Sequence, residues 1–213
     1  HIVVSAGGTQ EPLDPVRYVG NRSTGKMGFA IAEAARDRGA HVTLVTGPVA
    51  LETPYGIHRV DVNTVAEMLV ALEQATADSD AIIMSAAPAD YRPANPSAHK
   101  LKKSSDEGAL DIGLVKNPDI IATLPAGGVR VGFAAETRNL EEYARQKLPA
   151  KRLDFIVAND VSAAGSGFGT DTNQVTIFHS DGRHEELPMM TKYAVGLAIL
   201  DRVATRLSRG ASR

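Results

Sequence analysis

The sequence predicts an α/β fold, with a doubly wound, mostly parallel sheet that carries helices on both faces. The main indication is that short apolar segments alternate along the chain with segments of helical periodicity. With 213 residues, the chain is long enough to bury a hydrophobic core of its own. Its composition, 43% hydrophobic and 23% charged, is typical of a globular protein and not of a disordered one.

Five short apolar segments are the expected strands of this sheet. They lie at residues 2–5, 41–45, 81–85, 129–134 and 154–158. The first begins almost at the first residue, so we expect this sequence to be a piece of a longer protein.

Four helices are expected between and after these strands. In the second, Thr64 and Glu67 form a capping box ahead of a regular apolar stripe. The first is predicted to be capped by Ser23 or Thr24 and to end near Gly39. The helical patterns cover residues 27–35, 65–72, 139–147 and 191–207.

Two segments depart from this alternation. Residues 93–117 are mostly polar and then alternate apolar with other residues, which predicts an inserted hairpin or flap. Residues 174–187, with Asp181-Gly182 at their turn, predict a terminal β-hairpin. We therefore expect residues 1–213 to form one domain with a flap at about 93–117. The flap carries the lysines Lys100, Lys102 and Lys103.

Composition and charge exclude several classes of function. The net charge of −2 argues against a protein that coats nucleic acid. Without cysteine the chain has no disulfide framework, no thiolate nucleophile and no cysteine-based zinc site, and its six histidines lack metal-ligand spacing. The longest apolar run, residues 81–89, is too short to span a membrane, and no secretory signal is visible. We expect a cytoplasmic protein with no nucleic-acid or membrane partner.

The segments that follow the predicted strands point to a ligand site. In open, Rossmann-like sheets ligands bind outside the carboxyl ends of the strands, near the point where the strand order reverses. Small residues there let a ligand approach backbone amides, although tight strand-to-helix turns need the same residues for steric reasons. The segments rich in small residues are 5–9, 86–90 and 134–136, and Asn159-Asp160 follows the last strand.

One segment resembles a phosphate-binding P-loop but lacks two of its features. Residues 20–26 fit G-x-x-x-x-G-K, but Met27 stands where a P-loop needs Ser or Thr, and the motif does not directly follow a strand. Gly7-Gly8 lacks the rest of a dinucleotide-binding fingerprint, which disfavours hydride transfer. Ser5 and Ser85 lack the nucleophile elbow of a hydrolase.

Polar side chains near these loops are candidates for binding and catalysis. Arg17 suits bidentate binding of a phosphate or carboxylate, and the Asn21 amide can donate to a developing oxyanion. Asp90 could bind a ribose hydroxyl, a base or a metal-bridged phosphate, and the flap lysines could close over a triphosphate. The structural alternatives are a solvated Arg, a turn-forming Asn, a capping Asp and a solvated lysine face. The residues alone indicate a nucleotide- or phosphate-binding α/β domain with a lysine-bearing flap.

Seven segments form longer motifs. They are SAGGTQEPLDPVRY (5–18), NRSTGKMG (21–28), ADYR (89–92), HKLKK (99–103), KNPDI (116–120), GFAAE (132–136) and AND (158–160). Together they resemble bacterial phosphopantothenate–cysteine ligase, in the same order and over nearly the whole chain. In that family the ligase domain usually follows a flavin-dependent decarboxylase in a bifunctional coenzyme A enzyme. The resemblance therefore implies a decarboxylase domain in the full-length chain and no FMN on this part.

The resemblance also implies a two-step ligation in coenzyme A biosynthesis. The carboxylate of 4′-phosphopantothenate attacks the α-phosphate of CTP, giving an acyl-cytidylate and pyrophosphate. The amine of L-cysteine then attacks the activated carbonyl, giving phosphopantothenoylcysteine and CMP. Magnesium is expected on the triphosphate, with Asp90 as its protein ligand.

Site residues carry over by motif. The resemblance implies that Lys100 stabilises charge while the cytidylate forms, that Asn21 holds the acyl-cytidylate, and that Arg17 lies beside Asn21. The Gly7-Gly8 turn and Ala87 would admit phosphates at close range. The positions that match CTP contacts of the family are Asp90, Lys100, Pro118, Asp119, Ile120, Ile121, Phe133, Lys147 and Lys151.

The same resemblance implies a homodimer, because the family's flap reaches toward a neighbouring subunit to form composite sites. Pro88 departs from the family pattern and removes one amide donor at the nucleotide site. Two alternatives stay open. Eukaryotic relatives use ATP, and the fold could serve as a non-catalytic nucleotide-binding or sensor module. A nicotinamide-dependent reductase is a more distant third.

Overall fold

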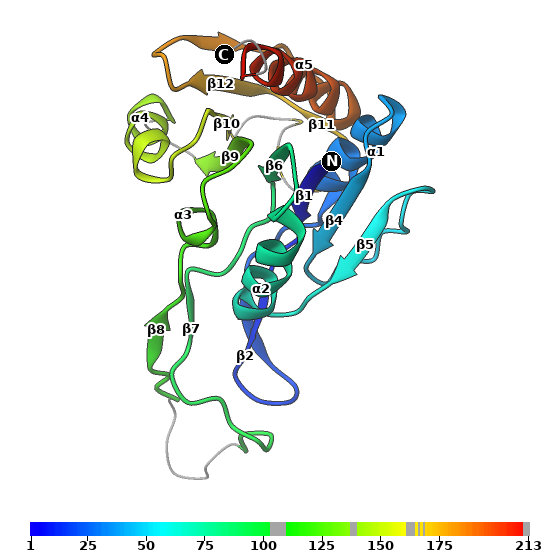
Figure 1. Ribbon diagram of the computed structural model, residues 1–213. Helices are drawn as coiled ribbons and strands as arrows, with labels where there is room; N and C mark the ends of the chain where they lie inside the picture. Colours follow the sequence, from blue (N-terminus) through cyan, green and yellow to red (C-terminus); the bar gives the residue numbers. More distant parts are fainter. Residues whose placement is uncertain (103–109, 137–139, 161–164, 166, 168, 211–213) are drawn as a thin grey trace.

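The computed structural model describes residues 1–102, 110–136, 140–160, 165, 167 and 169–210. Its main sheet contains β1 (Ile2–Ala6), β4 (Val42–Thr46), β5 (His58–Asp61), β6 (Ala81–Met84), β9 (Val129–Glu136), β10 (Phe155–Asp160), β12 (Val175–His179) and β13 (His184–Glu186). These lie in the order β13-β12-β10-β9-β6-β1-β4-β5 (Figure 1). The pairs formed by β12 and β13 are antiparallel and all others are parallel. The mostly parallel sheet is thus confirmed, and all five predicted strands are present to within two residues.

Helices cover both faces of the sheet. They are α1 (Lys26–Asp37), α2 (Val65–Thr76), α3 (Ile120–Thr123), α4 (Leu140–Ala150) and α5 (Lys192–Gly210). Along β1, Ile2 and Val4 point into the core under α1 and α5, whereas Val3 points into the core under α2, α3 and α4. The doubly wound class is therefore confirmed. No helix of the described residues is both long and apolar enough to cross a membrane.

The first helix begins differently from the prediction. Its N-cap is Gly25, which has a φ of 79° and no side-chain cap, so the expected capping by Ser23 or Thr24 is wrong. A side chain at this position would be strained and would meet Val49 at 2.9 Å. The predicted cap of α2 is confirmed, because the Thr64 hydroxyl accepts from the Glu67 amide at 3.2 Å.

The last helix packs directly on the first. At Gly196 of α5, an added Cβ would lie 3.2 Å from the carbonyl oxygen of Ala30 in α1. This close approach lets α5 cover the same face of the sheet as α1.

Three small two-stranded pairs lie outside the main sheet. They are β2 (Gln10–Pro12) with β3 (Tyr18–Gly20), β7 (Tyr91–Pro93) with β8 (Leu114–Lys116), and β11 (Thr172–Asn173) with β14 (Met190–Thr191). The β7–β8 pair is the base of the predicted flap, which we call the arm and define as residues 91–102 and 110–116; residues 103–109 lie outside the described residues. The arm and the neighbouring β2–β3 hairpin project from one end of the molecule (Figure 1). The predicted C-terminal hairpin is β12–β13, which extends the main sheet.

Candidate functional site

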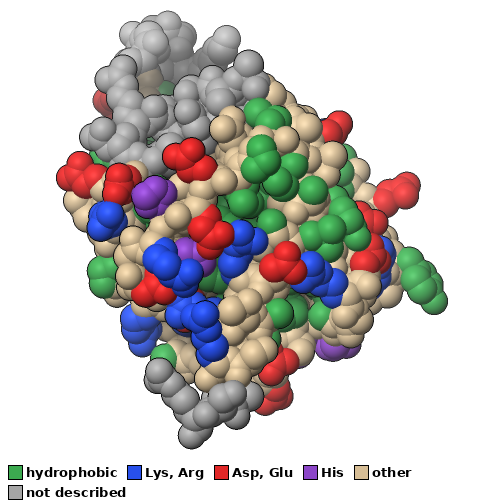
Figure 2. All heavy atoms as spheres, turned by 90° about the horizontal axis from the view of Figure 1, so that it is seen from above, with side chains coloured by type: hydrophobic (Ala, Val, Ile, Leu, Met, Phe, Trp, Pro, Cys, Tyr) green, Lys and Arg blue, Asp and Glu red, His purple; other side chains and the backbone are tan. Residues whose placement is uncertain are grey.

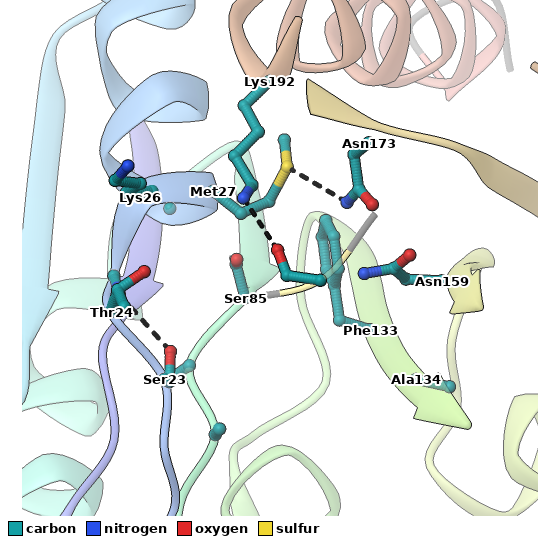
Figure 3. A pocket seen from close by; sticks show the side chains of 15 residues that line it. Ser23, Thr24, Lys26, Met27, Ser85, Phe133, Ala134, Asn159, Asn173 and Lys192 are labelled. Carbon is teal, nitrogen blue, oxygen red and sulfur yellow. Dashed lines mark hydrogen bonds between the residues drawn. The ribbon is translucent and has the colours of Figure 1, made fainter. Parts of the chain in front are cut away.

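A pocket of about 170 Å³ lies at the carboxyl ends of the parallel strands. From β1 the chain continues to β4 and β5 on one side, whereas β6 lies on the other side of β1, so the strand order reverses here. Such a reversal is where open α/β sheets bind ligands. We call this cavity the α1 pocket, because the N-terminus of α1 forms one wall (Figure 3). Its lining is Ser23, Thr24, Gly25, Lys26, Met27, Gly28, Ser85, Ala86, Ala87, Phe133, Ala134, Asn159, Gly167, Asn173 and Lys192.

Two lysines give the α1 pocket its charge. Lys192 is 5% exposed, and its ammonium donates to the carbonyl oxygens of Gly167 (2.8 Å) and Thr170. Burial lowers the pKa of Lys192, as does the charge of Lys26, whereas Asp171 acts in the opposite direction. Lys26 itself pairs with Asp171 at 2.7 Å. Because the hydrogen bonds of this buried ammonium go to neutral carbonyl oxygens, its positive charge can attract an anion bound in the pocket.

Neutral polar groups complete this pocket. The buried hydroxyl of Ser85 has no hydrogen-bond partner in the described residues. The first amides of α1 lie at the same wall, and a helix N-terminus favours bound phosphate or carboxylate. The arrangement therefore fits a polyphosphate.

A second pocket of about 110 Å³ adjoins the first. We call it the α4 pocket, and its lining is Met84, Ala86, Pro88, Asp119, Ile120, Ile121, Gly132, Phe133, Lys147, Lys151, Leu153 and Ile156. Ala86 and Phe133 line both pockets, so the two cavities are neighbours. Lys151 pairs with Asp119 at 2.9 Å across the cavity. An aromatic ring, aliphatic walls and two cations fit a base and its ribose.

Two arginines support the wall that α3 gives to the α4 pocket. The buried Arg130 donates to the carbonyl oxygens of Pro125 (2.7 Å) and Ile121. Arg152 donates to those of Ala122 (3.0 Å) and Leu124 (3.3 Å). Carbonyls at the end of this one-turn helix are thereby satisfied by side chains of the sheet and of the loop after α4.

The predicted residues fall into two groups. Seven of them line a pocket: Ala87, Asp119, Ile120, Ile121, Phe133, Lys147 and Lys151. Those that line neither pocket are Gly7, Gly8, Arg17, Asn21, Asp90, Lys100 and Pro118.

The Gly7-Gly8 turn is explained by packing within the chain. An added Cβ on Gly8 would lie 2.7 Å from the carbonyl oxygen of Asn21, and one on Gly7 would lie 3.0 Å from Val49. The Gly7 carbonyl also accepts from the Ala87 amide at 2.8 Å. The absence of side chains here is required for the loop after β1 to pack against Asn21 and against the loop after β4.

Asn21 lies between the two pockets. Its amide donates to the carbonyl oxygens of Ala87 (3.2 Å) and Pro88 (3.0 Å). Ala87 lines the α1 pocket and Pro88 the α4 pocket, so the Asn21 side chain is at their common rim.

Arg17 does not lie beside Asn21, and that expectation is corrected. The two residues are at opposite ends of β3, which separates them by about 13 Å at the usual rise of a strand. The Arg17 guanidinium instead binds the Asp14 carboxylate at 2.5 Å and the carbonyl oxygen of Leu101 at 3.1 Å.

Asp14 and Arg17 together form a clamp on the arm. The Asp14 carboxylate is buried and also accepts from the backbone amide of Leu101 at 3.1 Å. Both backbone groups of Leu101 are thus held, directly next to Lys100. The Arg17 side chain keeps the pKa of the Asp14 carboxyl well below its ordinary value, assisted by the amides of Val16 and Leu101 and opposed by burial.

This clamp predicts acid sensitivity. Because the pKa of Asp14 is lower in the folded chain than in the unfolded chain, its ionised form stabilises the fold above an unfolded pKa of about 3.9. That contribution decreases as the pH falls below this value. The free energy of unfolding of Asp14→Asn should therefore fall less steeply below pH 4 than that of the parent, measured by urea unfolding at several pH values. Parallel pH profiles for the two proteins would contradict the clamp.

Comparison with known proteins identifies the family. The sequence profile of the DNA/pantothenate metabolism flavoprotein C-terminal domain matches residues 1–207. This chain belongs to that family. The resemblance seen in its motifs is thereby confirmed.

Individual relatives of this flavoprotein C-terminal domain agree. The chain is 50% identical over 211 residues to the coenzyme A biosynthesis bifunctional protein CoaBC of Escherichia coli (strain K12). The match covers 97% of this chain and 52% of that protein. A crystal structure of the C-terminal domain of a CoaBC protein superposes with a TM-score of 0.82 and 39% identity, covering 98% of this chain and 95% of that one. A complex of the Cab2 mutant H337A with phosphopantothenate-cysteine shares the fold, with a TM-score of 0.78, 16% identity, and coverage of 99% and 87%. The chain spans about half the length of the curated relatives it matches.

Sequence reasoning missed three residues that organise this site of the flavoprotein C-terminal domain. Lys192 was counted only as part of a helix with an apolar stripe, Asp14 only as part of a motif, and Arg130 only as part of a strand. An ionisable side chain within an otherwise apolar run, as at Arg130, is a signal for a buried role. No comparable signal marks Asp14 or Lys192, because their burial depends on segments distant in sequence.

Proposed function

We propose that this domain joins 4′-phosphopantothenate to L-cysteine in coenzyme A biosynthesis, with CTP as the activating nucleotide and an acyl-cytidylate as intermediate. The observation that carries the proposal is the α4 pocket. It gathers six of the nine positions matched to CTP contacts, from the α3 segment, β9 and the end of α4. The names of the CoaBC relatives support the same pathway.

The two pockets divide the nucleotide between them in this proposal. The base and ribose lie in the α4 pocket, against Phe133 and near Lys147 and Lys151. The triphosphate lies in the α1 pocket, where Lys192 and the amides of α1 balance its charge. The α-phosphate then falls at the common rim, beside Asn21.

Chemistry at the rim needs groups that stabilise charge as it develops. The carboxylate attacks the α-phosphorus and pyrophosphate leaves; cysteine then attacks the acyl carbon and CMP leaves. The Asn21 amide, which donates to the carbonyl oxygens of Ala87 and Pro88, would exchange one of these bonds for one to an oxygen at the rim, and Lys100 supplies a cation during the first step. Magnesium fits the same scheme, because it is commonly held by one or two carboxylates together with substrate phosphates. The exposed carboxylate of Asp90 can serve as that ligand, and no group of three or more His, Asp or Glu side chains converges among the described residues.

A second copy of the chain completes this site in our proposal. Lys100 and Arg17 are on the arm and its clamp, whereas Asn21 is at the rim of the pockets. Large apolar side chains are exposed along the arm and the β2–β3 hairpin: Val16, Tyr18, Tyr91, Leu110, Ile112, Leu114 and Val115. Several exposed apolar side chains on segments that contact one another are typical of an interface. The arm of each protomer would carry Lys100 to its partner's site.

Pyrophosphate release tests the proposed function directly. With CTP and 4′-phosphopantothenate but no cysteine, we expect release of about one equivalent per site, and sustained turnover once cysteine is added. Neither CTP alone nor ATP should give this release. Release with ATP in place of CTP would assign an ATP-using ligase. No release with any nucleotide, together with measurable nucleotide binding, would assign a binding module.

Loss of the buried cation should weaken nucleotide binding. We expect Lys192→Met to raise the KM for CTP about ten- to a hundredfold, since hydrogen bonds to charged groups contribute about 1.5–3 kcal/mol, with a smaller change in kcat. Arg38→Met, which removes a cation from the far end of α1, is the matched control. If Lys192→Met is less stable but has an unchanged KM for CTP, the role of Lys192 is structural: it holds the carbonyl groups of Gly167 and Thr170 and does not bind the nucleotide.

A further inference from the structure

A separate cavity of about 230 Å³ lies at the opposite end of the sheet. It is formed by the C-terminal half of α5 and the β12–β13 hairpin. His179 at its floor pairs with Phe155 at the start of β10, whereas the α1 pocket lies at the carboxyl end of that strand. We call it the arginine pocket; its lining is His179, Arg183, Glu185, Asp201, Arg202, Thr205, Arg206 and Arg209. Figure 2 views the face that carries α5 and β12, where Lys and Arg side chains gather beside His and acidic ones.

The carboxylates around this cavity are already engaged. Asp181 pairs with Arg183 at 2.8 Å, Asp201 with Arg38 at 2.6 Å, and Glu185 with both His179 (2.7 Å) and Arg202 (2.5 Å). Arg206 is different, since its partners among the described residues are neutral: the Asp154 carbonyl oxygen at 3.4 Å and the Ser180 hydroxyl at 3.3 Å. In the described part of the chain, neither Arg206 nor Arg209 forms an ion pair. The cavity therefore has an excess of positive charge.

Two buried nitrogen atoms in the cavity lack partners. They are Nδ1 of His179 and Nε of Arg202, each without a hydrogen bond within the described residues. The side chain of His179 is only 4% exposed. Buried polar atoms are nearly always satisfied by protein, water or ligand, so a water molecule or a bound group is expected beside these two nitrogens.

The helix dipole accounts for only part of this arrangement. Cations in the last turn of a helix are stabilised by its carbonyl end, which suffices to explain Arg209. It does not explain Arg206, which precedes the last turn and has only neutral partners among the described residues, or the unpartnered nitrogens of His179 and Arg202. Guanidinium groups from two elements that face one cavity match the bidentate geometry of a phosphate.

We propose that the arginine pocket binds a small phosphorylated ligand through a terminal phosphate, with Arg206 and Arg209 as its main contacts. Its lining of guanidinium groups favours a phosphate, a pyrophosphate or a small phosphate monoester. Because it lies at the other end of the sheet, such a ligand would act as an effector and not as a substrate.

Nuclear magnetic resonance of the arginine Nε–H groups tests this binding site by site. The chain is titrated with inorganic phosphate, pyrophosphate or glycerol phosphate, at constant ionic strength maintained with chloride. We expect saturable shifts of the Arg202 and Arg206 signals. In the double variant Arg206→Gln/Arg209→Gln, the affinity measured on the Arg202 signal should fall at least tenfold. Arg145→Gln, on the exposed side of α4, should behave as the parent.

The choice of probe separates the sources of the phosphate, and two outcomes overturn the proposal. Strongest binding of glycerol phosphate assigns a monoester, and strongest binding of pyrophosphate or phosphate assigns the inorganic ion. Arg206→Lys, which keeps the charge but not the bidentate geometry, should bind with intermediate affinity. This variant keeps the proposal testable if the double variant does not fold. Equal shifts with chloride alone would overturn the proposal, as would shifts that persist unchanged in the double variant. Pyrophosphate release by the α1 and α4 pockets is measured separately, so failure here leaves the proposed function untouched.

Discussion

Replacing Lys100 with Ala is expected to lower kcat by about 10²–10³-fold, the usual cost of removing one group that stabilises a transition state. The side chain is exposed and lies on the arm, so the fold should change little and the affinity for CTP should fall less than kcat. The measurement is pyrophosphate release with 4′-phosphopantothenate, alongside thermal unfolding. Lys116→Ala, elsewhere on the arm, is the control. A normal rate of release in Lys100→Ala would remove Lys100 from the first step.

A mixture of two inactive variants tells whether Lys100 acts in the partner's site. Lys100→Ala and Asn21→Ala are each expected to be nearly inactive as homodimers. After subunit exchange, half of the dimers are mixed, and each mixed dimer has one site with both native residues if the arm crosses to the partner. Activity should then recover to about a quarter of the parent value. If Lys100 serves its own chain, no site in the mixture is intact and activity stays absent.

Replacing Gly47 with Ala should be among the most destabilising substitutions in the chain. The added methyl group would lie 2.1 Å from the carbonyl oxygen of Gly8, a contact with backbone that no rotamer change can relieve. Overpacking of this kind costs about 1–3 kcal/mol, and we expect the upper part of that range. Gly8 in turn contacts the backbone of Asn21, so any displacement reaches the rim of the two pockets. The variant should therefore lose activity as well as stability.

Chemical denaturation and pyrophosphate release together check this prediction. Gly127→Ala is the matched control, because nothing lies within 4 Å of the added Cβ there and its effect should stay within about 0.5 kcal/mol. If Gly47→Ala unfolds at the same denaturant concentration as the control, the loops after β1 and β4 are not as closely packed as described. If it is destabilised but fully active, Gly8 does not transmit the displacement to Asn21.

The fold was predictable where a local pattern determines the structure. Apolar runs located the five strands, and the Thr64–Glu67 capping box located the start of α2. The cap of α1 was not predictable, because Gly25 has a left-handed conformation and Val49, from another segment, fills the space that a side chain there would need. The β2–β3 hairpin was missed, since its strands have three residues each and show no alternation.

The site was predictable as a set of motifs but not as a geometry. The family resemblance predicted that Phe133, Lys147 and Lys151 contact the nucleotide, and the fold brings these three residues into one pocket. The motifs could not show that Arg17 binds Asp14 and the arm, because that contact joins residues 84 positions apart.

The contact between α5 and α1 has a consequence for how the protein is made. The α1 pocket needs Ser23 to Gly28 from the start of the chain and Lys192 from the last helix. On the ribosome, which extends the chain from its N-terminus, α1 emerges long before α5 can cover it. In the proposed function, the nucleotide therefore cannot stabilise a nascent chain that still lacks α5. Chains that stop before α5 would expose the apolar face of α1 and lack the Lys192 side of the α1 pocket, so we expect chaperones and proteases to recognise them.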